Sequence, residues 1–189
     1  MIFISADWPY AVFDEVEYAE MSARNFNQVN TRFEAETNWI GVVGEDVFEM
    51  WLKHHRVSYH RWTHDNWNEK KDFTVNVKPP VSIDVKMLST KYFPRLSYMC
   101  MVTEDQLLDA EVDAYVFGRY VLVENRAILI GWLSRMEFMQ LAVKRQEGYV
   151  CPENGFTSRR DMREAPLGIL RPLRSLIRDT GTRTGMKPD

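Results

Sequence analysis

Residues 81–88, with the sequence VSIDVKML, are the stretch that decides the fold prediction. The stretch is rich in β-branched residues and partly alternates, which is typical of a strand. Because successive side chains of a strand point to opposite faces, Asp84 and Lys86 are expected to share one face. The other face then carries four apolar side chains, those of Val81, Ile83, Val85 and Met87. A carboxylate and an ammonium on one face of a central strand are costly unless they are paired or functional. On an edge strand they would be an ordinary solvated ion pair, and the sequence leaves both interpretations open.

A second strand is predicted just before this one, at residues 72–77, with Lys78-Pro79-Pro80 as the connection. The two strands are expected to form a hairpin. Asp72 begins the first strand, so the hairpin would bring it near Asp84. Two neighbouring carboxylates repel each other unless they share a proton or bind a cation. A hard cation such as Mg²⁺ is commonly held by one or two carboxylates together with waters and phosphate oxygens.

A third acid lies earlier in the chain. Gly44 precedes a predicted amphipathic helix at residues 45–55, whose apolar residues recur at helical spacing. Glu45 would open that helix. It could join the metal site, or it could simply be a carboxylate favoured by the positive end of the helix dipole. Glu49, one turn further on, is the fallback for the metal-site role.

The remaining chain predicts an α+β fold, also describable as mixed α/β, with a mixed central sheet. Helices are expected at 13–35, from Thr103 to about 110, from Ser134 to about 143, and at 167–178 with an early break at Pro172. Both Thr103 and Ser134 start a capping-box pattern. Strands are expected at 57–62, 98–102, 112–123 and 126–133, with Glu124-Asn125 as a tight turn. Loops are expected at 64–71 and 148–166, and residues from 180 onward are expected to be frayed.

This order of elements and acids resembles the PD-(D/E)XK nuclease superfamily, whose members share a restriction-endonuclease-like αβββαβ core. The resemblance is carried by Glu45 on a helix, Asp72 at a strand start, and Asp84-Val85-Lys86 in the next strand. Residues 44–52 look like the early helix of that superfamily and residues 83–87 like its signature strand. The capped helix after Thr103, followed by residues 113–117, fits the end of the core. The resemblance covers about residues 40–133.

The chain departs from the superfamily pattern at one position. The proline expected before the first Asp is Lys71 here, which leaves Asp65 as a rival for Asp72. Asp72 is better placed, because a valine-rich strand follows it at once. The only other acid-x-Lys match, at residues 69–71, lies in a polar stretch.

The resemblance implies a metal-dependent nuclease that hydrolyses DNA phosphodiester bonds, with an endonuclease as the first expectation. It also implies Mg²⁺ or Mn²⁺ as the cofactor, held by Asp72, Asp84, Glu45 and the backbone carbonyl of Val85. Lys86 would orient the attacking water or stabilise developing negative charge. The alternatives are an exonuclease or junction resolvase of the same superfamily, and a non-catalytic module that binds nucleic acid or serves assembly.

The charge distribution suits a DNA partner better than the net charge of −3 does. Residues 157–187 carry eight basic and three acidic residues, a net +5, whereas residues 1–156 carry a net −7. Phosphate contacts are therefore expected from the basic segment or from the loop before Asp72. The candidates are Lys70, Lys71, Arg159, Arg160 and Arg163. We expect a nuclease-like domain at residues 1–145 and a basic appendage at 146–189 packed on it, although a purely solvated appendage is the alternative.

Other residues carry weaker indications. His60 and His64 have a spacing that could chelate a transition metal, although solvated histidines are the commoner case. Trp62, Trp67 and Phe73 could stack on bases or simply pack in the core. Two cysteines far apart, Cys100 and Cys151, predict neither a zinc knuckle nor a disulfide framework.

The same sequence predicts a cytoplasmic protein without a membrane partner. No signal-peptide pattern is visible, and the longest apolar run, at residues 127–133, is too short to span a bilayer. A homodimer is left open.

Overall fold

The computed structural model describes residues 2–4, 11–13, 35–62, 71–109, 111–152 and 155–178 of the 189-residue chain. Three expectations therefore lie wholly or mainly outside the described residues. They are the helix at 13–35, the polar loop at 64–71 apart from Lys71, and the frayed end from 180.

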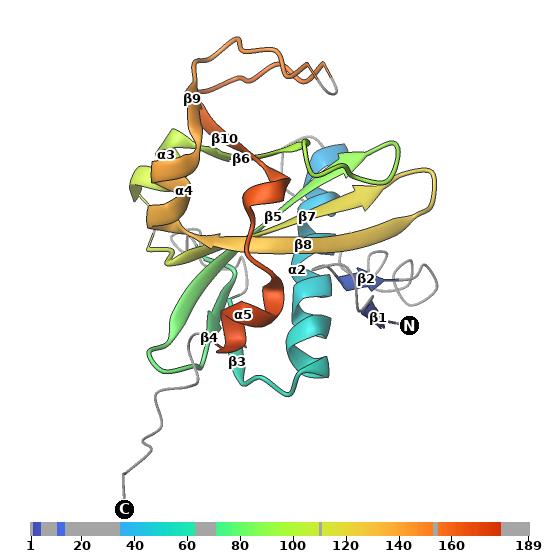
Figure 1. Ribbon diagram of the computed structural model, residues 1–189, viewed down its shortest axis with the longest axis vertical. Coiled ribbons are helices and arrows are strands. Elements are labelled where there is room, and N and C mark those ends of the chain that lie inside the picture. The colour runs from blue at the N-terminus through green and yellow to red at the C-terminus, as the bar shows by residue number, and fades with distance from the viewer. Residues whose placement is uncertain are drawn as a thin grey trace, which may run out of the picture.

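The central element is a seven-stranded sheet that runs through the middle of the molecule (Figure 1). Its strands are β1 (Ile2–Ile4), β2 (Ala11–Phe13), β3 (Tyr59–Arg61), β4 (Phe73–Val75), β5 (Val81–Thr90), β7 (Ala114–Val121) and β8 (Arg126–Ser134). They lie in the order β1-β2-β8-β7-β5-β4-β3, and all neighbours are antiparallel except β5 and β7. The predicted mixed sheet is confirmed. Because β5 lies between β4 and β7, the interpretation of residues 81–88 as an edge strand is wrong.

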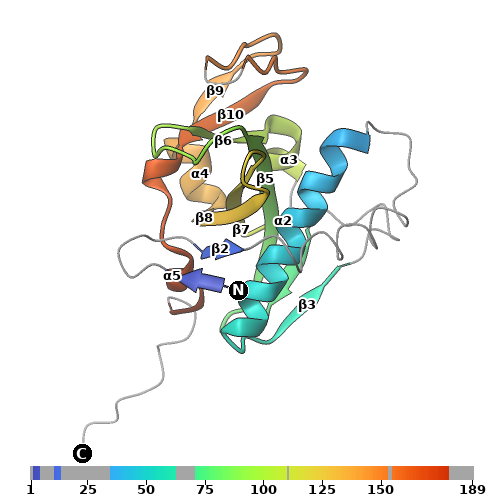
Figure 2. The ribbon, with the colours of Figure 1, turned by 90° about the vertical axis from the view of Figure 1, so that its right-hand side faces the viewer.

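Helix α2 (Ala35–His54) is longer than the sequence predicted, because it begins ten residues earlier. Gly44 was expected to precede the helix, but it lies inside it. The reason is packing: a Cβ atom at Gly44 would stand 2.7 Å from the Cβ atom of Met87 on β5. Glycine therefore lets α2 lie close against the sheet, alongside β5 (Figure 2). Glu45 is consequently in the middle of a helix and not at its start.

A second, three-stranded sheet contains β6 (Met99–Thr103), β10 (Met162–Pro166) and β9 (Val143–Arg145), in the order β6-β10-β9. The prediction of a loop at 148–166 is wrong for β10, whose residues pair with both neighbours. Its sequence, MREAP, has little β propensity, and long-range pairing determines its structure. The connection between β9 and β10 extends beyond the body of the molecule (Figures 1 and 2).

The short helices confirm several local predictions. Helix α3 (Glu104–Asp109) follows Thr103, and α4 (Arg135–Leu141) follows Ser134. The capping box at Ser134 is present: its side chain accepts a hydrogen bond from the Glu137 N–H, and the Glu137 carboxylate accepts one from the Ser134 N–H. The tight turn between β7 and β8 is also present, with Asn125 at a φ of 48°. Such signals are local in sequence, which is why they could be recognised.

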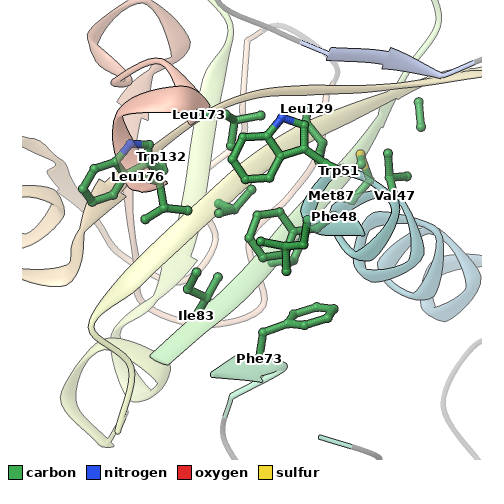
Figure 3. Close-up of a cluster of buried hydrophobic side chains, with 14 of the residues drawn as sticks. Val47, Phe48, Trp51, Phe73, Ile83, Met87, Leu129, Trp132, Leu173 and Leu176 are labelled. Carbon is green, nitrogen blue, oxygen red and sulfur yellow. The ribbon is translucent and has the colours of Figure 1, made fainter. Parts of the chain in front are cut away.

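Two hydrophobic cores lie on the two faces of the central sheet. The first joins α2 to the sheet and to α5 (Leu173–Arg178), and Figure 3 shows Leu173 beside Trp51 and Leu129. The second lies under α3, α4 and the small sheet, and includes Leu107, Phe138 and Ala165. Every residue of β7 is buried, because the strand is covered on both faces. These two layers make the architecture α+β.

The C-terminal part of the described chain belongs to this architecture. After the 3₁₀ turn η1 (Leu167–Ile169) the chain passes Pro172 and forms α5, so the predicted break at Pro172 is confirmed. Leu173 and Leu176 of α5 are buried in the first core. The expected boundary at residue 145 lies at the end of β9, which pairs with β10 of the segment expected to be the appendage. Within the described ranges, no helix has the length and apolar character that crossing a membrane requires.

Candidate active site

The β4–β5 hairpin positions the two central carboxylates. Phe73 pairs with Ile83, so Asp72, one residue before β4, stands opposite Asp84. The Asp72 N–H donates to the Ile83 carbonyl at 2.9 Å. The Asp72 Oδ2 atom accepts a hydrogen bond from the Val85 N–H at 2.7 Å. The Val85 N–H thus bonds to a side chain instead of to a backbone carbonyl of a neighbouring strand. This hydrogen bond fixes the Asp72 carboxylate beside β5 at the point where β4 ends.

Asp84 and Lys86 lie on the face of β5 that is turned away from α2. Their neighbours Ile83, Val85 and Met87 pack into the core with α2, so the predicted alternation is confirmed. The Lys86 Nζ atom lies 2.6 Å from the Asp84 Oδ2 atom. Asp84 is only 5% exposed, and the Lys86 side chain is 21% exposed. This is an ion pair within a central strand and not a solvated surface pair.

The carboxylates repel one another, and their ionisation is correspondingly difficult. Burial raises the pKa of Asp72 well above its ordinary value, and the nearby Asp84 and Glu45 carboxylates raise it further. Burial also raises the pKa of Asp84, although Lys86 opposes that effect. Asp72 and Asp84 stand opposite each other across the hairpin, so each carboxyl group opposes the ionisation of the other. The repulsion within such a pair is relieved either by a proton that the two carboxyl groups share or by a bound cation.

Glu45 reaches the same region from α2. It is 7% exposed, and its charge raises the pKa of both Asp72 and Asp84. The alternative role at a helix N-terminus is excluded, because Glu45 lies well inside α2. Its Oε2 atom accepts a hydrogen bond from Nη2 of Arg61 at 3.1 Å. Glu45 is therefore near the two aspartates but already has a cationic partner.

Glu49, the fallback for Glu45, serves a different purpose. It bonds to the Tyr59 hydroxyl at 2.6 Å, to Arg61 at 2.8 Å and to Lys53 at 2.8 Å. Burial acts to raise its pKa, but the hydrogen bonds to Lys53, Tyr59 and Arg61 outweigh burial and lower the pKa to about 2. Glu49 is therefore an ionised anchor of β3 on α2, and we do not assign it to the metal site.

Arg61 is a residue of the site that the sequence analysis missed. Its Nη1 atom donates to Asp46 at 2.6 Å and to Glu49 at 2.8 Å, in addition to the Nη2 contact with Glu45. Asp46 is 2% exposed, and its ion pair with Arg61 at 2.6 Å helps to stabilise a buried acid there. A signal was present in the sequence: three acids at positions 45, 46 and 49 interrupt the apolar stripe of a helix, which requires a basic partner from elsewhere.

Tyr115 is a second missed residue. It pairs with Asp84 across the parallel β5–β7 ladder, so the two lie in neighbouring strands at the same level. Burial and then the Asp84 charge raise the pKa of the Tyr115 hydroxyl, which donates to the Gln106 carbonyl at 3.4 Å. A buried phenol beside Asp84 keeps that side of the carboxylate dry. The sequence offered only an aromatic residue in a strand, which is normally core packing.

The donor atoms suit a hard divalent cation. Asp72 and Asp84 provide two carboxylates. The N–H and C=O groups of one strand residue point to the same side, so the Val85 carbonyl lies along the edge where its N–H meets Asp72. Oxygen ligands of this kind fit Mg²⁺ or Mn²⁺. Among the described residues, no three side chains of His, Cys, Asp or Glu are arranged closely enough to hold a metal ion.

The expected nucleic-acid contacts stay predictions, and the structure gives the present partners of three of these residues. Lys71 is described, and its Nζ atom lies 4.8 Å from the centre of the Trp62 ring. Arg160 pairs with Asp105 at 2.8 Å, and Arg163 pairs with Glu104 at 2.8 Å. Arg163 also donates to the Met139 carbonyl at 2.8 Å, and its role in binding phosphate stays a prediction.

The remaining residues that the sequence suggested for the site differ in where they lie. Phe73 is fully buried and packs against Phe48, so core packing is confirmed among the two interpretations that the sequence left open for it. Arg159 is exposed, and its role in binding DNA stays a prediction. The rival acid Asp65, and also His64, Trp67 and Lys70, lie outside the described residues.

Comparison of the chain with protein-family models, with curated proteins and with solved structures finds no match. The functional argument therefore depends on the geometry described above.

Proposed function

We propose that the protein is a metal-dependent nuclease that hydrolyses DNA phosphodiester bonds. One observation carries the proposal: the Val85 N–H holds the Asp72 carboxylate opposite Asp84, beside the Asp84–Lys86 ion pair, at the place where β4 ends. Such crowding of acids next to a lysine is costly for folding alone. Its chemical use is to hold a divalent cation next to a cationic group.

The order of elements supports the PD-(D/E)XK resemblance. Helix α2 is followed by β3, β4 and β5, then by α3 and β7, which is the αβββαβ sequence. Glu45 lies on the first helix, Asp72 at the start of the second strand, and Asp84 and Lys86 in the third. One strand, β6, is inserted before α3, and it joins the small sheet instead of the central one.

Asp72, Asp84 and the Val85 carbonyl would hold the ion, and Mg²⁺ or Mn²⁺ there would lower the pKa of a bound water and neutralise phosphate charge. The residues of the chain have separate tasks. The Val85 N–H holds the Asp72 carboxylate in place at 2.7 Å. Lys86 holds Asp84 at 2.6 Å and keeps its own side chain partly exposed, so its ammonium group can face a substrate as well.

The reaction needs little else from the protein. A water oxygen forms a new bond to phosphorus, the bond from phosphorus to the leaving oxygen breaks, and a proton moves from the water to the leaving oxygen through solvent. Lys86 donates a hydrogen bond to the attacking water or to a phosphate oxygen as negative charge builds up. Tyr115 limits the access of other water to Asp84, which strengthens these electrostatic effects.

A nicking assay on supercoiled plasmid with Mg²⁺ or Mn²⁺ tests the proposal, with a chelator as the blank. We expect metal-dependent nicking that is lost in Asp84→Asn. The matched control is Glu124→Gln, which removes an exposed carboxylate in the β7–β8 turn that pairs only weakly with Arg126 at the surface. Equal cleavage by wild type and Asp84→Asn would overturn the assignment of the site.

A panel of linear, circular, single-stranded and branched DNA then defines the type of activity. Cleavage of circular DNA indicates an endonuclease, whereas cleavage that needs an end indicates an exonuclease. A preference for branched DNA indicates a junction resolvase. Metal-independent binding to every substrate without any cleavage would support the non-catalytic alternative instead.

A further inference from the structure

The guanidinium group of Arg61 has a fixed position between α2 and the sheet. Two of its hydrogen bonds are short, at 2.6 Å to Asp46 and 2.8 Å to Glu49. Asp46 is buried, and Glu49 is held in turn by Tyr59 and Lys53. The planar group also lies over the Phe73 ring, with 5.7 Å between Cζ and the ring centre. Arg61 therefore stays in place whether or not its third partner is present.

That third partner, Glu45, has the longest of the three contacts. Its Oε2 atom lies 3.1 Å from Nη2 of Arg61. Charge-assisted hydrogen bonds are normally shorter than this. If the Glu45 carboxylate turned away, Arg61 would still be bonded to Asp46 and Glu49. Arg61 therefore holds Glu45 less tightly than it holds Asp46 and Glu49.

Glu45 also lies within electrostatic reach of the two aspartates. Its neighbour Gly44 packs against Val85 and Met87 of β5, and the Glu45 charge acts unfavourably on both Asp72 and Asp84. A dication held by the aspartates would attract the same carboxylate that Arg61 now holds. Arg61 and an ion held by the aspartates would therefore attract the same carboxylate from two sides.

We propose that Arg61 and the metal ion compete for the Glu45 carboxylate, so that Arg61 is a positioning residue that weakens metal binding and limits the site to the ligands Asp72, Asp84 and Val85. This inference rests on the proposed metal site. With Arg61 in place, Glu45 contributes little to metal affinity. When Arg61 is removed, Glu45 becomes an additional oxygen ligand and the ion binds more tightly.

The test is a titration with Mn²⁺ followed by calorimetry, which needs no DNA and no activity. We expect Arg61→Gln to bind Mn²⁺ about tenfold more tightly than wild type, since about one charge-assisted hydrogen bond no longer competes. We expect the same substitution to have no effect in a Glu45→Gln background. A tightening of equal size in both backgrounds would overturn the proposal, because it would show only the loss of a nearby positive charge. Unchanged or weaker binding in Arg61→Gln would overturn it as well.

Lys53→Gln is the matched control, because it removes a positive charge from the same network without touching Glu45. It should leave Mn²⁺ affinity close to that of wild type. If Arg61→Gln does not fold, because buried Asp46 loses its cation, the pair Asp46→Asn and Asp46→Asn/Arg61→Gln gives the same comparison with the buried charge removed. Loss of Mn²⁺ binding in Asp84→Ala marks the metal site itself. Binding that persists in Asp84→Ala would disprove the proposed function, whereas binding that is lost there but insensitive to Arg61→Gln would disprove only the competition.

Discussion

Replacement of Lys86 by alanine should separate cleavage from folding and metal binding. Lys86 is not a metal ligand, yet it stands 2.6 Å from Asp84 on the candidate site's face of β5. Removing a group that stabilises charge in a transition state commonly costs about 2–4 kcal/mol. At about 1.36 kcal/mol for each tenfold change, the rate of cleavage should fall about 30- to 1,000-fold. Mn²⁺ affinity should be maintained or increased, because a positive charge next to the aspartates has been removed.

The cost to stability follows from the burial of the pair. Breaking a fully buried ion pair costs about 3–5 kcal/mol. Here the Lys86 side chain is 21% exposed, and Asp84 can take up a proton because burial already raises its pKa. We therefore expect Lys86→Ala to lower the free energy of unfolding by only about 1–2 kcal/mol, toward the smaller cost of leaving one polar partner unsatisfied. Added Mn²⁺ should recover part of that loss.

Single-turnover cleavage of a labelled oligonucleotide and urea denaturation measure the two effects. Lys91→Ala is the control, since Lys91 follows β5 in the sequence, is exposed and lies over the exposed Tyr92 ring. Cleavage by Lys86→Ala within about threefold of wild type, less than 1 kcal/mol of barrier, would refute the reasoning and reduce Lys86 to a structural ion-pair partner.

Three further predictions concern the framework of the site. Gly44→Ala should destabilise the protein by about 1–3 kcal/mol, because the new Cβ atom would lie 2.7 Å from Met87 and overpack the core. Alanine favours helices by up to about 1 kcal/mol relative to glycine, which opposes this effect. Thermal unfolding shows whether the variant is less or more stable than wild type. Leu173→Ala should lower the free energy of unfolding by about 2–5 kcal/mol in urea denaturation, as expected for a core leucine. A loss below about 0.5 kcal/mol would show that α5 is only loosely attached to the core. Glu49 has a lowered folded pKa of about 2, so its stabilising effect is complete above its unfolded pKa of about 4.5 and is lost as the pH falls from 4.5 through 2. Solvent screening limits that effect to about 1 kcal/mol, and the stability difference between wild type and Glu49→Gln should shrink over this pH range; a constant difference would contradict the assignment.

The parts of the site that could be predicted from sequence are those made by local structure. The hairpin of β4 and β5 needs only two short strands and a proline-containing connection, and alternation within β5 then places Asp84 beside Lys86. The capping box at Ser134 likewise predicts the start of α4. In each case the decisive interactions join residues close in sequence, so a short stretch of sequence is enough to predict the local structure.

The parts that could not be predicted depend on distant contacts. Gly44 looks like a helix boundary, but its role is to bring α2 against Met87. The strand β10 has a weak strand sequence and exists because β6 and β9 pair with it. Arg163 belongs to a basic segment that suggested phosphate binding, yet its charge is directed at Glu104. Propensity and net charge describe a segment by itself, and they carry no information on what the fold places opposite it.

The candidate site has a consequence for the order of folding. Glu45, Arg61, Asp72, Asp84 and Lys86 all come from the consecutive elements α2, β3, β4 and β5, whereas the parallel partner β7 arrives only after a crossover that includes β6 and α3. Contacts between consecutive elements close short loops and tend to form early. A parallel pairing closes a longer loop, so its larger entropic cost delays it. We therefore expect the acids to be gathered, and to repel one another, before Tyr115 covers them. A divalent ion added during refolding should then accelerate folding, and not merely slow unfolding, because it removes this repulsion at the transition state.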